Sequence, residues 1–103
     1  DSLSKTREKS WDNFYRMLIA LRDVLRQQGI YRELEKDYIN YALHFCLWHY
    51  NSLAEPTKTK LRQILLLEWY GELGISDKSR EYFYDQYEYS QYEDMIRIDT
   101  EER

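Results

Sequence analysis

The sequence holds very little cysteine, proline, glycine or valine, and each shortage excludes a class of protein. Cys46 is the only cysteine among 103 residues, so an internal disulfide framework is excluded and a reducing compartment is favoured. Three glycines and one proline exclude collagen-like and linker-like chains. Val24 is the only valine and threonine is also scarce, which argues strongly against a β-sheet protein.

Long apolar runs and an excess of basic charge are missing as well. Apolar runs such as Ile64 to Leu67 are far shorter than the about 20 residues that span a bilayer, or the apolar core of a signal peptide. The chain carries 15 basic and 19 acidic side chains, a formal net charge of −4, and shows no basic face that would favour nucleic acid. We therefore expect a cytoplasmic protein that does not bind nucleic acid.

Apolar and aromatic side chains are abundant, and they recur at helical spacing. Trp11, Phe14, Leu18, Leu21 and Leu25 follow one another at intervals of three and four residues, which predicts an amphipathic helix. Ser10 is placed to cap the start of this helix. Gly29 stops it, because glycine tolerates the left-handed conformation that ends many helices, and Ile30 can pack back on the last turn.

A second helix is predicted from about Tyr31 or Leu34 to Leu53, with two apolar ridges side by side. The first ridge consists of Leu34, Tyr38, Tyr41, Phe45, Trp48 and Ser52. The second consists of Ala42, Cys46, His49 and Leu53. Together they predict one broad buried face.

Two further helical regions are predicted after Pro56, which suits a helical first turn. The first ends at Gly71 or at Gly74, where Gly74-Ile75 repeats the earlier stop. It carries Leu61, Ile64, Leu65, Leu67, Glu68 and Leu73, with Trp69 near them. We expect Ser76 and Asp77 to cap the start of the last helical region, which runs, with a break, toward Ile96.

These segments predict an all-α fold, a compact bundle of about four helices in an up-and-down or orthogonal arrangement. We expect one domain over residues 10–97. A flexible lead, 1–9, precedes it, and a frayed acidic tail, 98–103, follows it, since the end of the chain has no apolar residue to anchor it.

His44, Cys46 and His49 are residue types that bind metals or form nucleophilic pairs. At about 100° per residue, only Cys46 and His49 share a helix face, so we expect no metal site. A Cys46–His49 nucleophilic pair is disfavoured too, because the apolar neighbours of Cys46 oppose formation of the thiolate.

Two groups of side chains are candidate interaction surfaces. Aromatic side chains can stack on sugars or proteins, and basic ones can contact phosphate or acidic lipid. The aromatic group consists of Tyr84, Tyr87, Tyr89 and Tyr92, and the basic group of Lys58, Lys60 and Arg62. The alternatives are that the tyrosines pack the last helix on the bundle and that the cations form a solvated face.

Four segments carry a family resemblance, and they are Trp11 to Tyr15, Gly29 to Tyr31, Tyr38 to Trp48 and Glu72 to Ile75. Together they resemble the C-terminal helical region of bacterial family 2 glycosyltransferases, over about residues 7–90. The stretch after Arg80, rich in tyrosine and acid, does not match closely. The resemblance implies that the packing residues of the bundle include Trp11, Phe14, Tyr38, Phe45 and Trp48.

The resemblance also implies an upstream α/β domain that binds a nucleotide sugar and, through an Asp-x-Asp motif, a divalent metal. This sequence contains no Asp-x-Asp, so no catalytic or metal-binding residue and no cofactor is assigned to it. The expected function is that of a non-catalytic accessory domain, which braces the catalytic domain in cis or contacts a glycan or the inner membrane surface. The alternative is a free-standing helical adaptor that binds a partner protein.

Overall fold

The fold of residues 13–102, the part of the chain that the computed structural model describes, is built from helices alone. This confirms the predicted all-α class; the predicted lead 1–9 and Ser10 cap lie outside the described residues. In chain order the elements are α2 (Asn13–Gln27), α3 (Tyr31–Ser52), α4 (Thr57–Ile64), the π-helical turn η1 (Leu65–Trp69), α5 (Tyr70–Glu72), the 3-10 turn η2 (Arg80–Tyr82) and α6 (Gln86–Glu102).

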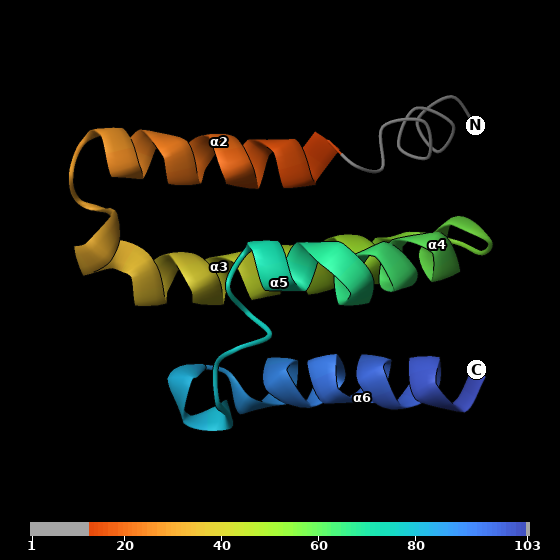
Figure 1. Ribbon diagram of the computed structural model, residues 1–103. Coiled ribbons are helices and arrows are strands. Elements are labelled where there is room, and N and C mark those ends of the chain that lie inside the picture. Colours follow the sequence, from red (N-terminus) through yellow and green to blue (C-terminus); the bar gives the residue numbers. More distant parts are fainter. Residues whose placement is uncertain (1–12, 103) are drawn as a thin grey trace.

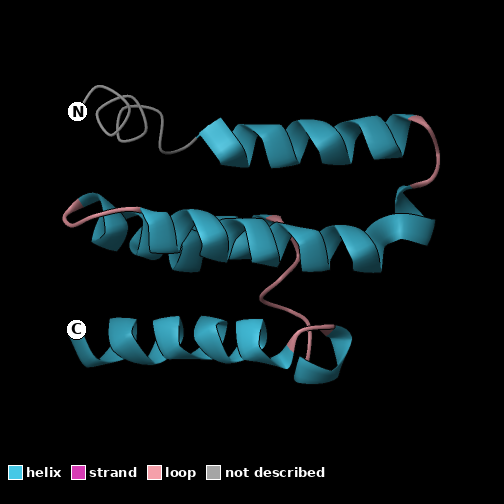
Figure 2. Cartoon of the chain, turned by 180° about the vertical axis from the view of Figure 1, so that it is seen from behind, coloured by secondary structure: helices cyan, strands magenta, loops and turns pink. Residues whose placement is uncertain are grey.

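Helix α3 is the central element of the bundle. Helix α2 lies along one flank of α3 and α6 along the other, while α4, η1 and α5 cover one of its sides (Figure 1). Figure 2 shows from behind that the first and last described helices keep to opposite flanks of the middle of the molecule. Successive long helices run in alternating directions, as in an up-and-down bundle.

Both predicted Gly-Ile stops are present and have the same geometry. Gly29 has a φ of 74° and Gly74 a φ of 86°. The N–H of Ile30 donates to the Leu25 carbonyl at 3.0 Å, and that of Ile75 donates to the Tyr70 carbonyl at 2.8 Å. This six-to-one hydrogen bond past a left-handed glycine defines the Schellman ending, and it turns the chain back at the end of α2 and again at the end of α5.

The hydrophobic core draws on every long helix. Its fully buried side chains include Leu18, Ile39, Leu43, Cys46, Leu61, Leu65, Tyr70, Leu73 and Ile75. Arg22 of α2 is also buried, and its guanidinium donates to the main-chain carbonyl of Glu72 at 2.8 Å and to the Glu72 carboxylate at 3.2 Å. Arg22 thus ties α2 to the end of α5, where helix carbonyls lack partners within the helix.

The π-helical turn changes which residues of the third helical region are buried. The N–H of Tyr70 donates to the carbonyl of Leu65, five residues earlier, so one extra residue enters the turn. Trp69 therefore reaches α2, where its ring stacks on Tyr15 with centroids 4.1 Å apart. Leu67, one of the apolar residues that the sequence places in this helical region, is 68% exposed.

The predicted buried face of α3 is wrong in part. Ala42 and Cys46 of the second ridge are buried, and so is Tyr38 of the first ridge, but Leu34, Tyr41 and Trp48 of that ridge are exposed. Trp48, expected as a packing residue, is 59% exposed. The physical reason is that α4, η1 and α5 cover only one side of α3 (Figure 1).

The last helix begins and ends later than predicted. Residues 76–79 form turns, so Ser76 and Asp77 cap no helix there. Asp85 caps α6 instead, since its carboxylate accepts hydrogen bonds from the N–H groups of Tyr87 at 2.9 Å and Glu88 at 3.2 Å. Helix α6 then continues to Glu102, through most of the segment expected to be a tail.

Candidate functional site

The outward side of α3 carries large apolar side chains where a solvent-facing helix is usually polar. Leu34, Tyr41 and Trp48 lie two turns apart on this side, and they are 38%, 44% and 59% exposed. Exposed apolar side chains that lie together on one face, unlike single scattered ones, mark binding surfaces.

A groove between α2 and α3 extends this apolar surface on one flank. It has a volume of about 260 Å³. The lining residues are Leu21, Leu25, Leu34, Asp37, Tyr38 and Tyr41. Met17 and Val24 of α2 are exposed and continue the apolar surface along the same helix.

A second groove, of about 300 Å³, lies between α3 and the start of α6. Its walls are held together by hydrogen bonds between the two segments. The Tyr84 hydroxyl donates to the Asp37 carboxylate at 2.5 Å, and this hydrogen bond raises the pKa of the Tyr84 phenol. The ring of His44 meets the carboxylate of Glu88 across the same groove.

A third groove, of about 210 Å³, surrounds Trp48 and Tyr87 and shares His44, Asp85 and Glu88 with the second groove. The first and second grooves share Asp37 and Tyr41, so the three form one continuous surface. We call it the α3 face, and its principal residues are Leu21, Leu34, Asp37, Tyr41, His44, Trp48, Tyr84, Asp85, Tyr87 and Glu88.

The charge of the α3 face has one sign. Asp37, Asp85 and Glu88 are the carboxylates that line its three grooves, and within residues 13–102 neither lysine nor arginine is among the lining residues. Lys36 lies close by, and its ammonium packs 5.5 Å from the centre of the ring of Tyr84, which lines the second groove, and 5.6 Å from that of Tyr82. The surface is therefore aromatic and acidic.

The four predicted surface tyrosines divide between this face and the core. Tyr84 and Tyr87 are exposed on the α3 face, Tyr87 by 73%. Tyr89 is half-buried beneath Phe83, and Tyr92 is buried, with its ring edge-on to Tyr70 at 5.0 Å. Two of the four can therefore meet a partner.

The predicted basic residues do not meet on a common surface. Arg62 is buried and points its guanidinium toward the Tyr50 hydroxyl at 3.5 Å. Lys58 lies over the Tyr50 ring at 4.9 Å, and Lys60 is exposed. Two of these cations therefore pack against Tyr50, while Lys60 is exposed on its own.

The cysteine and histidines of α3 point in different directions. Cys46 is completely buried, and burial raises the pKa of its thiol. His44 is exposed beside Glu88, whereas the ring of His49 packs on Phe14 with centroids 4.4 Å apart. Within residues 13–102, no three potential ligands of the His, Cys, Asp and Glu types come together as a metal centre would require.

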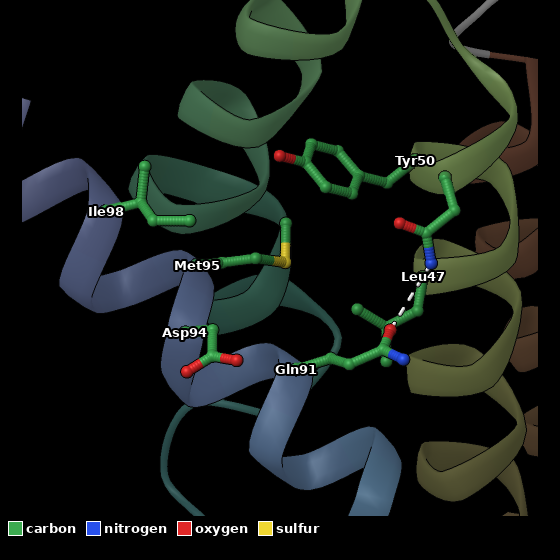
Figure 3. A pocket seen from close by; sticks show the side chains of 7 residues that line it. Leu47, Tyr50, Gln91, Asp94, Met95 and Ile98 are labelled. Atoms are coloured by element: carbon green, nitrogen blue, oxygen red, sulfur yellow. Dashed lines mark hydrogen bonds between the residues drawn. The ribbon is translucent and has the colours of Figure 1, made fainter.

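A small cavity of about 150 Å³ lies at the far end of the α3–α6 contact (Figure 3). Met95 and Ile98 of α6 face Leu47 and Tyr50 of α3 across it, and Asn51 donates a hydrogen bond to Gln91 at its edge. Its volume is well below the about 300 to 1,000 Å³ of small-molecule sites. It has room for a side chain of a partner, but not for a nucleotide sugar.

Sequence reasoning missed the aliphatic part of the α3 face, because it placed Leu21 and Leu34 in the core. One signal for it was available in the sequence. Helix α3 has 22 residues and two apolar ridges, and both ridges can be buried only if other elements cover the helix on two sides.

Comparison with protein-family models, curated proteins and solved structures found no match. None of the helices within the described range 13–102 is long and apolar enough to cross a membrane.

Proposed function

We propose that this chain is an accessory helical domain that binds a protein surface through the α3 face. The observation that carries the proposal is the exposed row of Leu34, Tyr41 and Trp48, flanked by grooves on both sides. Tryptophan and tyrosine are the residues that most often dominate binding energy at protein interfaces. Burying a large apolar side chain from full exposure contributes about 1.5 to 3 kcal/mol, and Trp48 has 59% of its surface left to bury.

The competing enzyme interpretation rests on Cys46 and His49, and the geometry argues against it. A nucleophilic cysteine needs an accessible, electropositive position that favours the thiolate. Cys46 has no exposed surface, and burial raises its thiol pKa. Binding through the α3 face therefore accounts for more of the structure than chemistry at Cys46.

The partner we propose is the catalytic domain of a family 2 glycosyltransferase, upstream in the same polypeptide. This step rests on the resemblance carried by the segments Tyr38 to Trp48 and Glu72 to Ile75. The nucleotide sugar and the divalent metal would then be bound by that domain, and the present chain would brace it. In the alternative function, a free-standing adaptor, the same face binds a separate protein.

The test starts from the DNA upstream of the codon for Asp1. An in-frame α/β domain with an Asp-x-Asp motif is expected, and its absence would remove the glycosyltransferase from the proposal. That domain and the 103-residue chain are then produced as two polypeptides, and their binding is measured by titration calorimetry.

Three variants decide whether the α3 face makes the contact. Trp48→Asp and Tyr41→Asp place a charge on the α3 face and are expected to weaken binding by at least about tenfold, a typical effect at an interface centre. Leu67→Asp is the matched control, because Leu67 is an equally exposed apolar residue on the covering layer. Equal binding by Trp48→Asp and the unchanged chain would refute the proposal.

A further inference from the structure

We infer that the α3 face receives a basic amphipathic helix, one whose lysine or arginine side chains flank an apolar stripe. The inference rests on the proposed function, since it takes the α3 face to be a binding surface and names the chemistry of its occupant. Shape, charge and aromatic content each contribute to the argument.

The shape of the α3 face suits a helix lying along α3. Leu34 and Trp48 are fourteen residues apart, which corresponds to about 21 Å along a helix. Grooves run on both flanks of this row, one against α2 and the others against the start of α6. A partner helix of about four turns would cover the row with its apolar stripe and place its flanking side chains over the grooves.

The charge of the face selects a basic partner. Asp37 lies between the first and second grooves, and Asp85 and Glu88 line the wall on the α6 side. Among the described residues no lysine or arginine lines these grooves, so cations on a partner would approach Asp37, Asp85 and Glu88. Complementary potentials of this kind steer association and fix which partner binds.

The aromatic rings of the face offer a second way to hold a cation. Elsewhere in this molecule cations lie over tyrosine rings, as Arg26 does over Tyr31 at 4.8 Å and Arg80 over Tyr89 at 5.0 Å. Tyr41 and Trp48 expose their rings beside the carboxylates of the face. A partner's lysine or arginine can therefore contact a carboxylate and a ring of the same face.

The same charges disfavour two other occupants. A second copy of the chain, joined by a two-fold axis through this face, would bring one acidic surface against another. A membrane surface carries anionic lipids and attracts basic segments, so an acidic face is repelled by it. Both occupants remain outcomes of the test.

The probe is a designed helical peptide of about 18 residues, long enough to cover the row at about 1.5 Å per residue. Leucine and tryptophan form its apolar stripe and lysine flanks it; a second peptide has glutamate in place of every lysine. Binding to the full 103-residue chain is measured by fluorescence anisotropy at about 0.05 M and about 0.3 M salt, since exposed charges are screened at the higher value. We expect the lysine peptide to bind at least about tenfold more tightly, with the difference shrinking at high salt.

A double variant isolates the charge of the face. Asp37→Asn with Asp85→Asn removes two carboxylates, yet asparagine can still accept the Tyr84 hydroxyl and still cap α6. This variant is expected to bind the lysine peptide about threefold to tenfold more weakly, as for two exposed ion pairs. Glu68→Gln with Asp77→Asn is the control, with the same change in net charge at exposed positions outside the grooves, and is expected to bind as the unchanged chain does.

The outcomes separate this inference from the proposed function. If both peptides bind equally and Trp48→Asp abolishes both, the α3 face is a binding surface but its occupant is not basic. If neither peptide binds, or if the lysine peptide binds Trp48→Asp unchanged, the inference is overturned. Self-association in the ultracentrifuge, or binding to phosphatidylserine vesicles, that is lost in Trp48→Asp would identify the other occupants and also overturn it.

Discussion

One thiol and two phenol groups in the core make the stability of the chain depend on pH. Cys46, Tyr38 and Tyr70 are all buried, and burial raises the pKa of each group. The Tyr38 hydroxyl donates to the Leu18 carbonyl at 2.7 Å, and that of Tyr70 reaches the Met95 sulfur at 3.4 Å. The folded chain therefore holds these protons more tightly than the unfolded chain does.

Stability is accordingly expected to fall at alkaline pH. Below the unfolded pKa values, about 8.5 for cysteine and about 10 for tyrosine, both states are protonated and the stability is fully present. As pH rises past these values the unfolded chain loses protons first, and each group then lowers the free energy of unfolding by about 1.4 kcal/mol per pH unit. Melting temperatures between about pH 8 and about pH 11 measure this slope.

Tyr38→Phe is the control for the alkaline slope. It removes one titrating group and one hydrogen bond, so stability at neutral pH falls by about 1 kcal/mol while the alkaline slope becomes shallower. An unchanged slope in this variant would show that Tyr38 ionises as easily in the folded chain as in the unfolded one.

Single residues were harder to predict than the fold class. Helical spacing correctly placed Phe14, Leu18 and Cys46 in the core. The same spacing wrongly placed Trp48 there, because hydrophobicity reports what a residue can bury and not whether another element lies over it.

At the scale of the helical element, the three glycines of this chain differ in how far an added side chain would change the stability. Gly29 and Gly74 have positive φ values, a conformation that side chains resist. A Cβ on Gly29 would meet nothing within 4 Å, whereas one on Gly74 would touch the Ile39 side chain at 3.4 Å. Gly71 lies within α5 and its Cβ would make an ordinary contact with Ser76 at 3.6 Å.

Alanine at these positions should therefore have opposite effects. Gly29→Ala and Gly74→Ala are expected to lower the free energy of unfolding by about 1 to 2 kcal/mol each, the cost of a left-handed residue with a Cβ. Gly71→Ala is expected to raise it by up to about 1 kcal/mol, because alanine favours helix. Urea unfolding of the three variants measures the differences, and a loss at Gly71 equal to that at Gly29 would contradict this account.

The elements themselves were predictable where a local rule decides them. The Gly-Ile pairs predicted two helix endings, because the left-handed turn and the apolar contact after it are local. The π-helical turn was not predictable, since it depends on how Trp69 meets Tyr15 of another helix. The start of α6 was missed because Ser76 and Asp77 fit the same capping rule as Asp85, and only the packing of residues 80–85 selects among them.

At the scale of the whole molecule, α3 contacts the 82–84 segment just before α6, and we call this contact the joint. It holds the last helix and one wall of the α3 face in place. Asn40 is its central residue, because its side-chain amide donates to the Tyr82 carbonyl at 3.2 Å and its oxygen accepts the Tyr84 N–H at 2.7 Å. These two contacts fix the chain just before α6 begins. Farther along the same helices, Asn51 donates one exposed hydrogen bond to Gln91 at 3.3 Å.

Asn40→Ala should loosen α6 from the bundle. The variant loses a part-buried hydrogen bond to the Tyr82 carbonyl and an exposed one from the Tyr84 N–H, which together cost about 1 to 3 kcal/mol. Because the segment anchors only α6, amide hydrogen exchange should speed up in α6 more than in α2 or α3.

Asn51→Ala is the matched control, since it makes the same change on the same pair of helices. Asn51 makes one long, exposed hydrogen bond, so its loss is expected to cost less than about 0.5 kcal/mol. Equal exchange rates in the two variants would show that Asn40 does not hold the joint, and that other contacts, such as the buried Phe83 and Met95 and the Tyr84–Asp37 hydrogen bond, hold α6 in place.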